Sequence, residues 1–317
     1  MAALLHVRVV LPEEHRAPAV TFVTDHVAVT NIVHLAGVAV DPTGDVLLFD
    51  VAREAANEVV RVLRDMGVTE RGSITIDHVR LSLGTGVTRA ELAAEGDPDR
   101  VVVWAEIDAD VEAGAHSTPS YLVYFAVAAI IAAAGILADS SILIVGAMVV
   151  GPEFGPLAAI AYGLERRRWW LVRRAIAALA AGTALAIVAA AAVADVLDLT
   201  DRIPDAYASG VRPLTSFISH PDLLSAIVAG AAAVAGMLSL TYERSGTLVG
   251  VLVSVTTVPA IANVGVAAAV GAWGEAWGAL GQLGVNVACL VVVGAITLRI
   301  QRRLTPQTVS ALPRRRP

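Results

Sequence analysis

The sequence contains no lysine, and its 317 residues include a single cysteine, Cys289. One cysteine excludes an intrachain disulfide. The 23 basic residues counted as lysine and arginine are therefore all arginines, which, with the alanine-rich runs, is typical of a GC-rich bacterial genome. The N-terminus also lacks a basic start followed by a short apolar core, so we expect no cleavable signal peptide.

Charged residues are scarce, at 16% of the chain, whereas apolar residues make up 56% and the mean hydropathy is +0.69. Soluble proteins average about 45–50% apolar residues. Nearly all long apolar runs lie in residues 119–299, while residues 1–118 mix charged and apolar side chains. We therefore expect one part of the chain in water and another in lipid.

The first 96 residues predict a cytoplasmic α+β domain of ferredoxin-like βαββαβ order. Alternating or β-branched apolar runs predict strands over 4–11, 37–40, 46–51 and 73–83. The turn sequence Asp41-Pro42-Thr43-Gly44 joins the middle two as a hairpin. Apolar residues at helical spacing predict helices over 18–36 and 52–66, the second ending at Gly67.

Small domains of this fold either sense a ligand or serve packing and oligomerisation, and the fold alone does not decide between them. Four histidines (His6, His26, His34 and His78) lack metal-ligand spacing. Gly84-Thr85-Gly86 indicates a turn rather than a phosphate loop, because no lysine followed by serine or threonine comes after it. We expect no metal and no cofactor.

Residues 97–118 predict a connecting helix, which Asp97-Pro98 would begin. One face of this helix would be partly apolar, and the rest of its surface would be acidic. A strand through residues 101–107 is the alternative. As a helix, this segment would couple the N-terminal domain to the first membrane span.

Six apolar segments approach the roughly 20 residues that cross about 30 Å of hydrocarbon. They lie near 119–138, 141–163, 170–194, 223–241, 246–271 and 278–298. The fold class is therefore an α-helical polytopic membrane domain of about six spans over 119–299, following the ferredoxin-like domain. Residues 300–317 form a basic tail.

The charges of the loops predict the orientation, because arginine-rich loops stay in the cytoplasm. Residues 165–174 and the tail are rich in arginine, whereas the loop 195–222 carries five aspartates. Six spans then place both termini in the cytoplasm and the chain in the bacterial inner membrane.

One apolar unit occurs twice, in residues 134–150 and 235–254. The first reads Ala-Gly-Ile-Leu and then Leu-Ile-Val-Gly; the second reads Ala-Gly-Met-Leu and then Thr-Leu-Val-Gly. With three spans in each copy, over 119–194 and 223–298, the second copy must be inverted relative to the first. Inverted repeats with broken middle helices are typical of secondary transporters. A re-entrant hairpin over 141–163 would change this count.

The middle span of the first copy contains residues that break a helix. Proline removes an N–H group and clashes with the carbonyl four residues earlier. A carboxylate at such a break, deep in the membrane, is costly unless it is protonated, paired or hydrated. The candidate binding residues here are Gly151, Pro152, Glu153, Gly155 and Pro156. Glu153 is the candidate for proton or cation coupling; alternatively it lies near one end of the span or caps the second half-helix.

The second copy has Pro259 opposite Pro156, which puts Thr256 or Thr257 opposite Glu153. Its candidate residues are Ser254, Thr256, Thr257, Pro259 and Asn263. Neutral oxygen and amide groups suit a sodium ion or a polar solute. The same groups also form ordinary hydrogen bonds between membrane helices.

The stretch from Asp139 to Ala158, with Gly-Ala-Met followed by Gly-Pro-Glu-Phe-Gly-Pro, resembles a bacterial family known as a domain of unknown function, number 389. Trp104 before the first span also fits that family, and the resemblance extends over nearly the whole chain. The second copy departs from the family's paired proline, since it reads Val258-Pro259. The resemblance implies a layout and no settled activity.

The sequence therefore favours a secondary transporter or ion-coupled carrier of a small solute or cation. A passive channel using the same broken helices is one alternative. A membrane-anchored sensor or scaffold acting through the N-terminal domain is another. No nucleophile–base pair or nucleotide loop indicates an enzyme. We expect membrane lipid as a partner, no nucleic acid, and a homo-oligomer.

Overall fold

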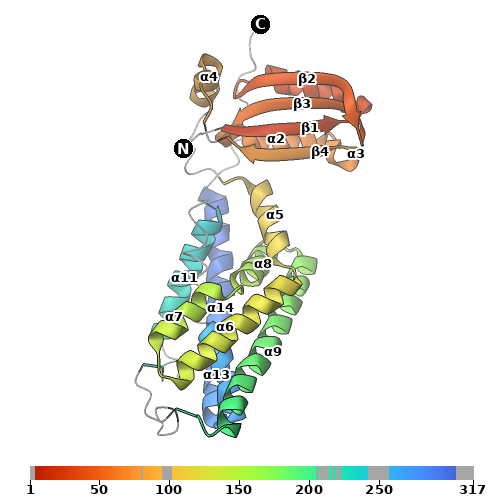
Figure 1. Ribbon diagram of the computed structural model, residues 1–317. Helices are drawn as coiled ribbons and strands as arrows, with labels where there is room; N and C mark the ends of the chain where they lie inside the picture. The colour runs from red at the N-terminus through yellow and green to blue at the C-terminus, as the bar shows by residue number, and fades with distance from the viewer. Residues whose placement is uncertain are drawn as a thin grey trace. The chain divides into compact units, whose positions relative to one another are not determined.

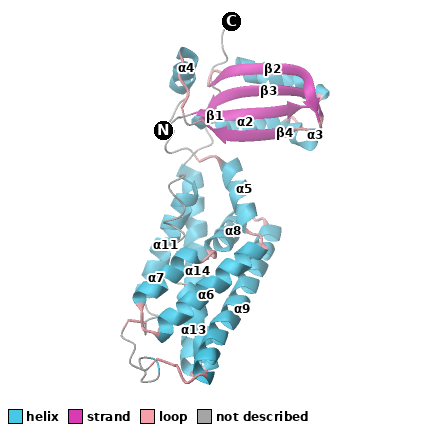
Figure 2. Ribbon diagram, viewed as in Figure 1, coloured by secondary structure: helices cyan, strands magenta, loops and turns pink. Residues whose placement is uncertain are grey.

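The computed structural model describes residues 4–79, 81–94, 102–204, 207, 214–215, 218, 223–241 and 257–304 (Figure 1). The chain divides into two compact units, one holding the described residues up to Glu106 and the other Ile107–Arg303. All the strands among the described residues belong to the first unit, and the second is helical (Figure 2).

The N-terminal unit is built on a four-stranded antiparallel sheet in the order β2-β3-β1-β4. The strands are β1 (Leu4–Leu11), β2 (Val29–Val40), β3 (Thr43–Ala52) and β4 (Ser73–His78). The helical segments are η1 (Glu13–His15), α1 (Arg16–Asp25), α2 (Arg53–Asp65), α3 (Val68–Arg71) and α4 (Thr85–Ala93).

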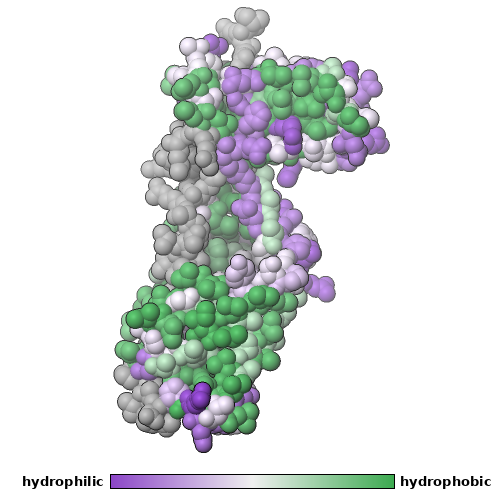
Figure 3. All heavy atoms as spheres, viewed as in Figure 1, coloured by the Kyte–Doolittle hydropathy of each residue, from purple (hydrophilic) through white to green (hydrophobic). Residues whose placement is uncertain are grey.

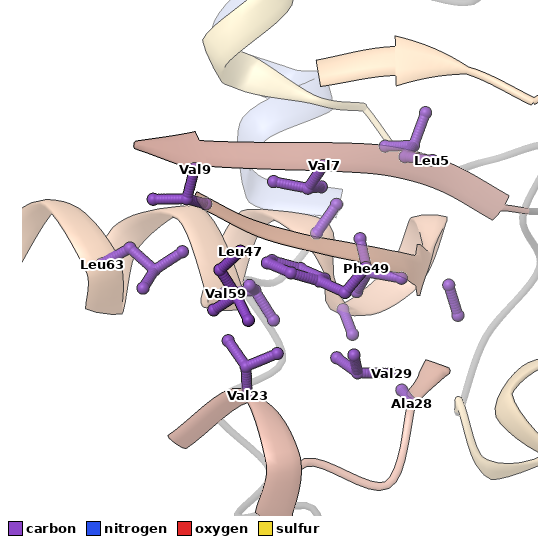
Figure 4. Close-up of a cluster of buried hydrophobic side chains, with 14 of the residues drawn as sticks. Leu5, Val7, Val9, Val23, Ala28, Val29, Leu47, Phe49, Val59 and Leu63 are labelled. Carbon is purple, nitrogen blue, oxygen red and sulfur yellow. The ribbon is translucent and has the colours of Figure 1, made fainter. Parts of the chain in front are cut away.

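The core of this unit lies between one face of the sheet and helices α1 and α2. Alternate side chains of β1 and β3, among them Val7 and Phe49, point toward Val59 and Leu63 of α2 (Figure 4). Each of these four side chains is fully buried. Burial of one such side chain contributes roughly 1.5–3 kcal/mol, so the alternating pattern of the strands fixes which face the helices cover.

The strand over 4–11 and the helix over 52–66 are confirmed, but the helix predicted over 18–36 is wrong beyond Asp25. Residues 29–40 instead form β2, which pairs with β3 and extends the expected hairpin back to Val29. The β-branched residues there favour a strand, and β2 pairs with β3 in three stretches separated by two irregularities of register. Pairing with a neighbouring strand thus overrode local helical spacing.

Two shorter predictions in this part of the chain also need correction, and the connecting helix is confirmed over part of its predicted length. Strand β4 ends at His78, short of residue 83. The turn expected at Gly84-Thr85-Gly86 is the beginning of α4, with Gly84 as its N-cap at φ 157°. Helix α5 (Trp104–Gly114) replaces the alternative strand over 101–107, although it begins later than Asp97-Pro98, which lies outside the described residues.

The second unit contains the apolar helices. They are α6 (Pro119–Leu137), α7 (Ser141–Val150), α8 (Phe154–Glu165), α9 (Trp169–Leu199), α11 (Leu223–Thr241), α13 (Val258–Ala269) and α14 (Trp273–Leu304). By length and composition, α6, α9, α11 and α14 are each able to cross a membrane, and the bent pair α7–α8 is a fifth candidate span. Helix α13 has 12 residues, and residues 246–256 lie outside the described chain, so the count of six spans stays a prediction.

The outer faces of these helices are apolar. In Figure 3 the surface over α6, α7 and α9 is nearly continuously hydrophobic. Large apolar side chains there are exposed, including Val123, Ile142 and Val188 at 61%, 82% and 64%. Monomeric soluble proteins seldom expose apolar patches of this extent. The unit is therefore that of a membrane protein.

Inside this unit, small residues let the helices approach closely. A Cβ added to Gly265 of α13 would lie 2.3 Å from the carbonyl oxygen of Ile187 in α9. A Cβ on Gly182 of α9 would lie 2.6 Å from the ring of Phe125 in α6. Close backbone contact at small residues is the usual basis of helix association in lipid, and here it holds α13 against α9 and α9 against α6.

One carboxylate of the N-terminal unit is buried and fully partnered. The side chain of Asp45 in β3 is 0% exposed; it pairs with Arg16 Nε and His34 Nε2, each at 2.6 Å, and accepts the Gly37 N–H at 2.9 Å. Burial by itself would raise the pKa of Asp45. The hydrogen bonds from Gly37, His34 and Arg16, with the guanidinium charge, lower it instead from 3.8 to about 2.

Asp45→Ala should lower the free energy of unfolding of this unit at neutral pH by about 1–3 kcal/mol, because three donors lose their acceptor. Hydrogen exchange of the β1–β3 amides in the full chain measures the change. Because the folded-state pKa is depressed, the contribution of Asp45 is complete above pH 3.8 and is lost as pH falls through about 2. The free energy of unfolding of Asp45→Ala should therefore change less than that of the parent as pH falls from 3.8 to about 2.

The matched control is Asp65→Ala, which removes a carboxylate that is 67% exposed at the end of α2 and should change exchange little. Equal protection in the Asp45 and Asp65 variants would contradict a stabilising role for Asp45.

Candidate functional site

The second apolar segment of the chain is broken, as the sequence predicts. Helices α7 and α8 meet at an angle of 58°, and residues 151–153 separate them. Gly151 ends α7 in an extended conformation, and Glu153 is the N-cap of α8. Pro152 and Pro156 explain the break, since neither has the N–H group that would continue the helical ladder.

Helix α13 begins in a similar way. Thr257 is its N-cap, and Pro259 stands in the first turn. Helices α8 and α13 each have 12 residues. Proline in a first helical turn needs no N–H partner and has the φ angle of a helix. Helices α8 and α13 are thus short, equal in length and start near a proline; we call them the half-helices.

The N-caps of the two half-helices touch each other. Thr257 Oγ1 donates a hydrogen bond to Glu153 Oε1 at 2.8 Å, across 104 residues of sequence. Glu153 is 0% exposed and Thr257 is 1% exposed. The Glu153 side chain makes no capping hydrogen bond to α8, so its carboxyl group faces the other half-helix instead. The N-terminal ends of both helices therefore lie at this carboxyl group.

A pocket of about 390 Å³ adjoins this hydrogen bond. Its polar lining residues are Glu153, Thr183 and Thr257, and the rest of the lining is apolar, from α8, α9, α13 and α14. On its rim Ile176 is 51% exposed. The carboxyl group therefore lies at the inner end of a mostly apolar pocket that opens on the outside of the bundle.

The remaining candidate residues are only partly brought together. Gly151, Pro152 and Gly155 are half-buried, whereas Pro156 and Pro259 are buried. Asn263 is 2% exposed but is absent from the described lining of the pocket. Ser254 and Thr256 lie outside the described residues.

Two further residues at the site were not predicted. Thr183 lines the pocket from α9, and its signal was a lone hydroxyl in an alanine-rich segment. Gly114, the last residue of α5, lies against the break: a Cβ on Gly114 would be 3.1 Å from the Cα of Gly155. No periodic pattern in the sequence pairs these two glycines.

Residues 148–292 match the model of a family described as a domain of unknown function, DUF389. The chain contains a DUF389 domain. The domain includes Glu153, Thr183, Thr257 and Asn263, so the hydrogen bond between the half-helices lies wholly within it. The match is narrower than the resemblance expected over nearly the whole chain. No curated protein and no solved structure matches the sequence.

Thr257→Val should destabilise the DUF389 domain by about 1–3 kcal/mol, because the buried Glu153 carboxyl loses a donor while the shape of the side chain is kept. Thr257→Ser, which keeps the hydroxyl, should be closer to the parent. Thermal unfolding in lipid nanodiscs measures both. The control is Thr297→Val in α14, whose hydroxyl bonds only the Val293 carbonyl of its own helix. A loss in Thr297→Val as large as that in Thr257→Val would contradict a special role for the contact between the half-helices.

Proposed function

We propose that the protein is a secondary transporter in which protonation of Glu153 is coupled to movement of a small solute, rather than an enzyme. The observation that carries the proposal is the hydrogen bond from Thr257 to the buried Glu153 carboxyl group. A charged carboxylate among membrane helices is costly and marks an ion or proton pathway by default.

The chemistry of this contact supports coupling. An ionised Glu153 only accepts hydrogen bonds, whereas a protonated one has an O–H to donate. Arrival of a proton therefore changes the contact that joins the two half-helices. A change in protonation that alters the contact between two packed elements is the kind of bias that shifts a two-state protein.

An inverted repeat is the arrangement that best explains how the two copies pack. Helix α13 of the second copy packs against α6 and α9 of the first. In return, Ala161 of α8 lies near Gly294 of α14, where a new Cβ would meet it at 3.3 Å. Such mutual exchange of half-helices, with a site at the interface of the repeats, is typical of inverted-repeat carriers.

The pocket supports a solute with an apolar body and one polar group. Three polar side chains line the pocket, and its other lining residues are aliphatic. Sites for small molecules commonly combine an apolar lining with few polar groups that fix orientation. A proton or a sodium ion is the candidate coupling ion, since both are compatible with a carboxyl and a hydroxyl oxygen.

For the N-terminal unit we propose a ferredoxin-like fold on the cytoplasmic side, with both termini in the cytoplasm. The order β2-β3-β1-β4 with α1 and α2 between strands supports the split βαβ topology. The arginines of 166–168 and 299–303 support the orientation, because basic segments flanking spans stay inside.

Glu153→Gln should abolish proton-driven uptake while the protein remains folded, because the amide keeps the shape but does not ionise. The measurement is the transient current of proteoliposomes on a solid-supported membrane, with a panel of small solutes added under a pH gradient. The control is Asp198→Asn, which removes an exposed carboxylate at the end of α9 and should retain the parent current.

The outcomes separate the competing functions. Solute flux that persists in Glu153→Gln without a pH gradient would indicate a passive channel. No flux in the parent, with Glu153→Gln and Thr257→Val both silent and an effect only when residues 1–96 are removed, would indicate a sensor or scaffold. Either result would refute the coupled carrier.

We further propose that the protein is a homo-oligomer joined through the open face of the sheet, the face away from α1 and α2. Two cross-strand pairs on that face are apolar, Val33 with Leu48 and Leu35 with Val46, and Arg8 of β1 borders them opposite Leu48. Val33 and Leu35 are 45% and 41% exposed. An apolar patch related to itself by a two-fold axis meets without opposing charges, so a second copy of the chain is the partner it fits.

The double variant Val33→Lys and Leu35→Lys should shift the purified full chain toward a smaller mass by light scattering, because like charges would face each other at the interface. The control is Leu83→Lys with Leu92→Lys, at residues 84% and 82% exposed outside the sheet. An unchanged mass in the first variant would exclude this face as the interface.

A further inference from the structure

Four arginines line a second pocket, which lies outside the site of the half-helices. This pocket, of about 540 Å³, is formed by Arg167, Arg299, Arg302, Arg303, Glu165, Leu164, Ala295 and Ile296. Four arginines and one glutamate give its lining a formal charge of +3. The residues come from the end of α8, the turn after it, and the last turns of α14. We call this the arginine pocket.

Only one of the four arginines has an ion-pair partner among the described residues. Arg302 NH1 pairs with Glu165 Oε1 at 3.1 Å, and the Glu165 side chain is 9% exposed. This ion pair joins the end of α8 to α14. In the part of the chain that the structure describes, Arg167, Arg299 and Arg303 form no ion pair, so three guanidinium groups are available to an anion.

The backbone of Arg167 has a left-handed conformation that is less favourable for arginine than for glycine. Helix α8 ends at Glu165 with Arg166 as its C-cap; Arg167 follows at φ 57°, and the Arg168 N–H is bonded to the Gly163 carbonyl at 2.8 Å. This is a Schellman motif, in which glycine is the usual residue at the left-handed position. A side chain there costs roughly 1 kcal/mol relative to glycine. Arg167 therefore stands where helix termination alone would favour glycine.

The arginine pocket lies at the depth where lipid head groups are expected. Trp169 and Trp170, two and three residues after Arg167, are 62% and 52% exposed, and exposed tryptophans mark the membrane–water interface. Ile296, in the wall of the pocket, is 52% exposed one helical turn before Arg299. The pocket thus combines guanidinium groups with an apolar wall on the side of the spans.

We propose that the arginine pocket binds the phosphate-bearing head group of an acidic membrane phospholipid. Guanidinium groups bind phosphate oxygens in paired hydrogen bonds, and basic pockets between membrane helices are suited to anionic head groups. The apolar wall favours a lipid over free phosphate, because an acyl chain covers Ile296 and Leu164 while the phosphate occupies the arginines.

The test compares lipid retention by the full chain in native mass spectrometry, with phosphatidylglycerol or phosphatidylcholine added at equal concentration. The parent should retain phosphatidylglycerol in preference. Arg299→Gln with Arg303→Gln should weaken retention about fivefold per arginine removed, the order expected for one charge at a lipid surface. Neither Arg299 nor Arg303 forms an ion pair with a described residue, so these substitutions leave no described carboxylate without its partner. Arg173→Gln with Arg174→Gln, at exposed arginines of α9 outside the pocket, is the control and should retain the lipid.

Arg167→Gly separates a binding role from a structural one. Glycine suits the left-handed position, so thermal stability should be unchanged or higher while retention of phosphatidylglycerol falls about fivefold. Equal retention of the two lipids by the parent, or equal losses in the pocket and control variants, would overturn the proposal. Displacement of phosphatidylglycerol by millimolar inorganic phosphate or glycerol phosphate would overturn the lipid as the source of the phosphate. If Arg167→Gly retains as much phosphatidylglycerol as the parent, Arg167 does not contribute to lipid binding.

Discussion

A carboxyl group enclosed by apolar helices must have hydrogen-bond donors, and this requirement organises the helical unit. The Glu153 carboxyl group accepts a hydrogen bond from the Thr257 hydroxyl, and this bond joins the start of α8 to the start of α13. These residues are 104 positions apart, so the contact forms only when the two copies of the apolar unit are assembled. Because unpartnered burial of a carboxylate is expensive, the position of one half-helix is tied to that of the other.

Close packing supplies the rest of the restraint on α13. Gly265 allows the carbonyl of Ile187 to approach where any side chain would collide, and Ala190 lies beside it. Neither contact depends on the charge of Glu153, so α13 has one flank fixed against α9 and one polar end at the Glu153 carboxyl group. An element held firmly along its length and polar at one end is suited to a small change in angle at that end. In the proposed carrier, this arrangement would connect protonation of the carboxyl group to movement of a helix.

The sequence predicted what local chemistry determines. The Gly-Pro-Glu-Phe-Gly-Pro segment broke the helix where expected, and the pattern of β1 and α2 predicted both elements closely. It failed where partners distant in sequence decide. Residues 29–36 have helical spacing but pair with β3, and Thr183 of the alanine-rich α9 lines the pocket although its lone hydroxyl did not indicate which helices it would face. Local spacing could not reveal which faces of the helices meet.

Helix α5 shows how the break is connected to the part of the chain that precedes it. Gly114 at its end packs on Gly155, two residues from Glu153. One turn earlier, Asp108 and Glu112 pair with Arg168 at 3.2 and 3.1 Å, which fastens α5 to the turn between α8 and α9. Tyr162 of α8 also donates to Asp108. The last turns of α5 are thus held by a polar contact with the half-helix that Glu153 begins and by ion pairs with the turn that follows it. Any tilt of α8 that follows protonation must either carry α5 along or break these ion pairs, so the polar contacts of α5 oppose motion at the carboxyl site.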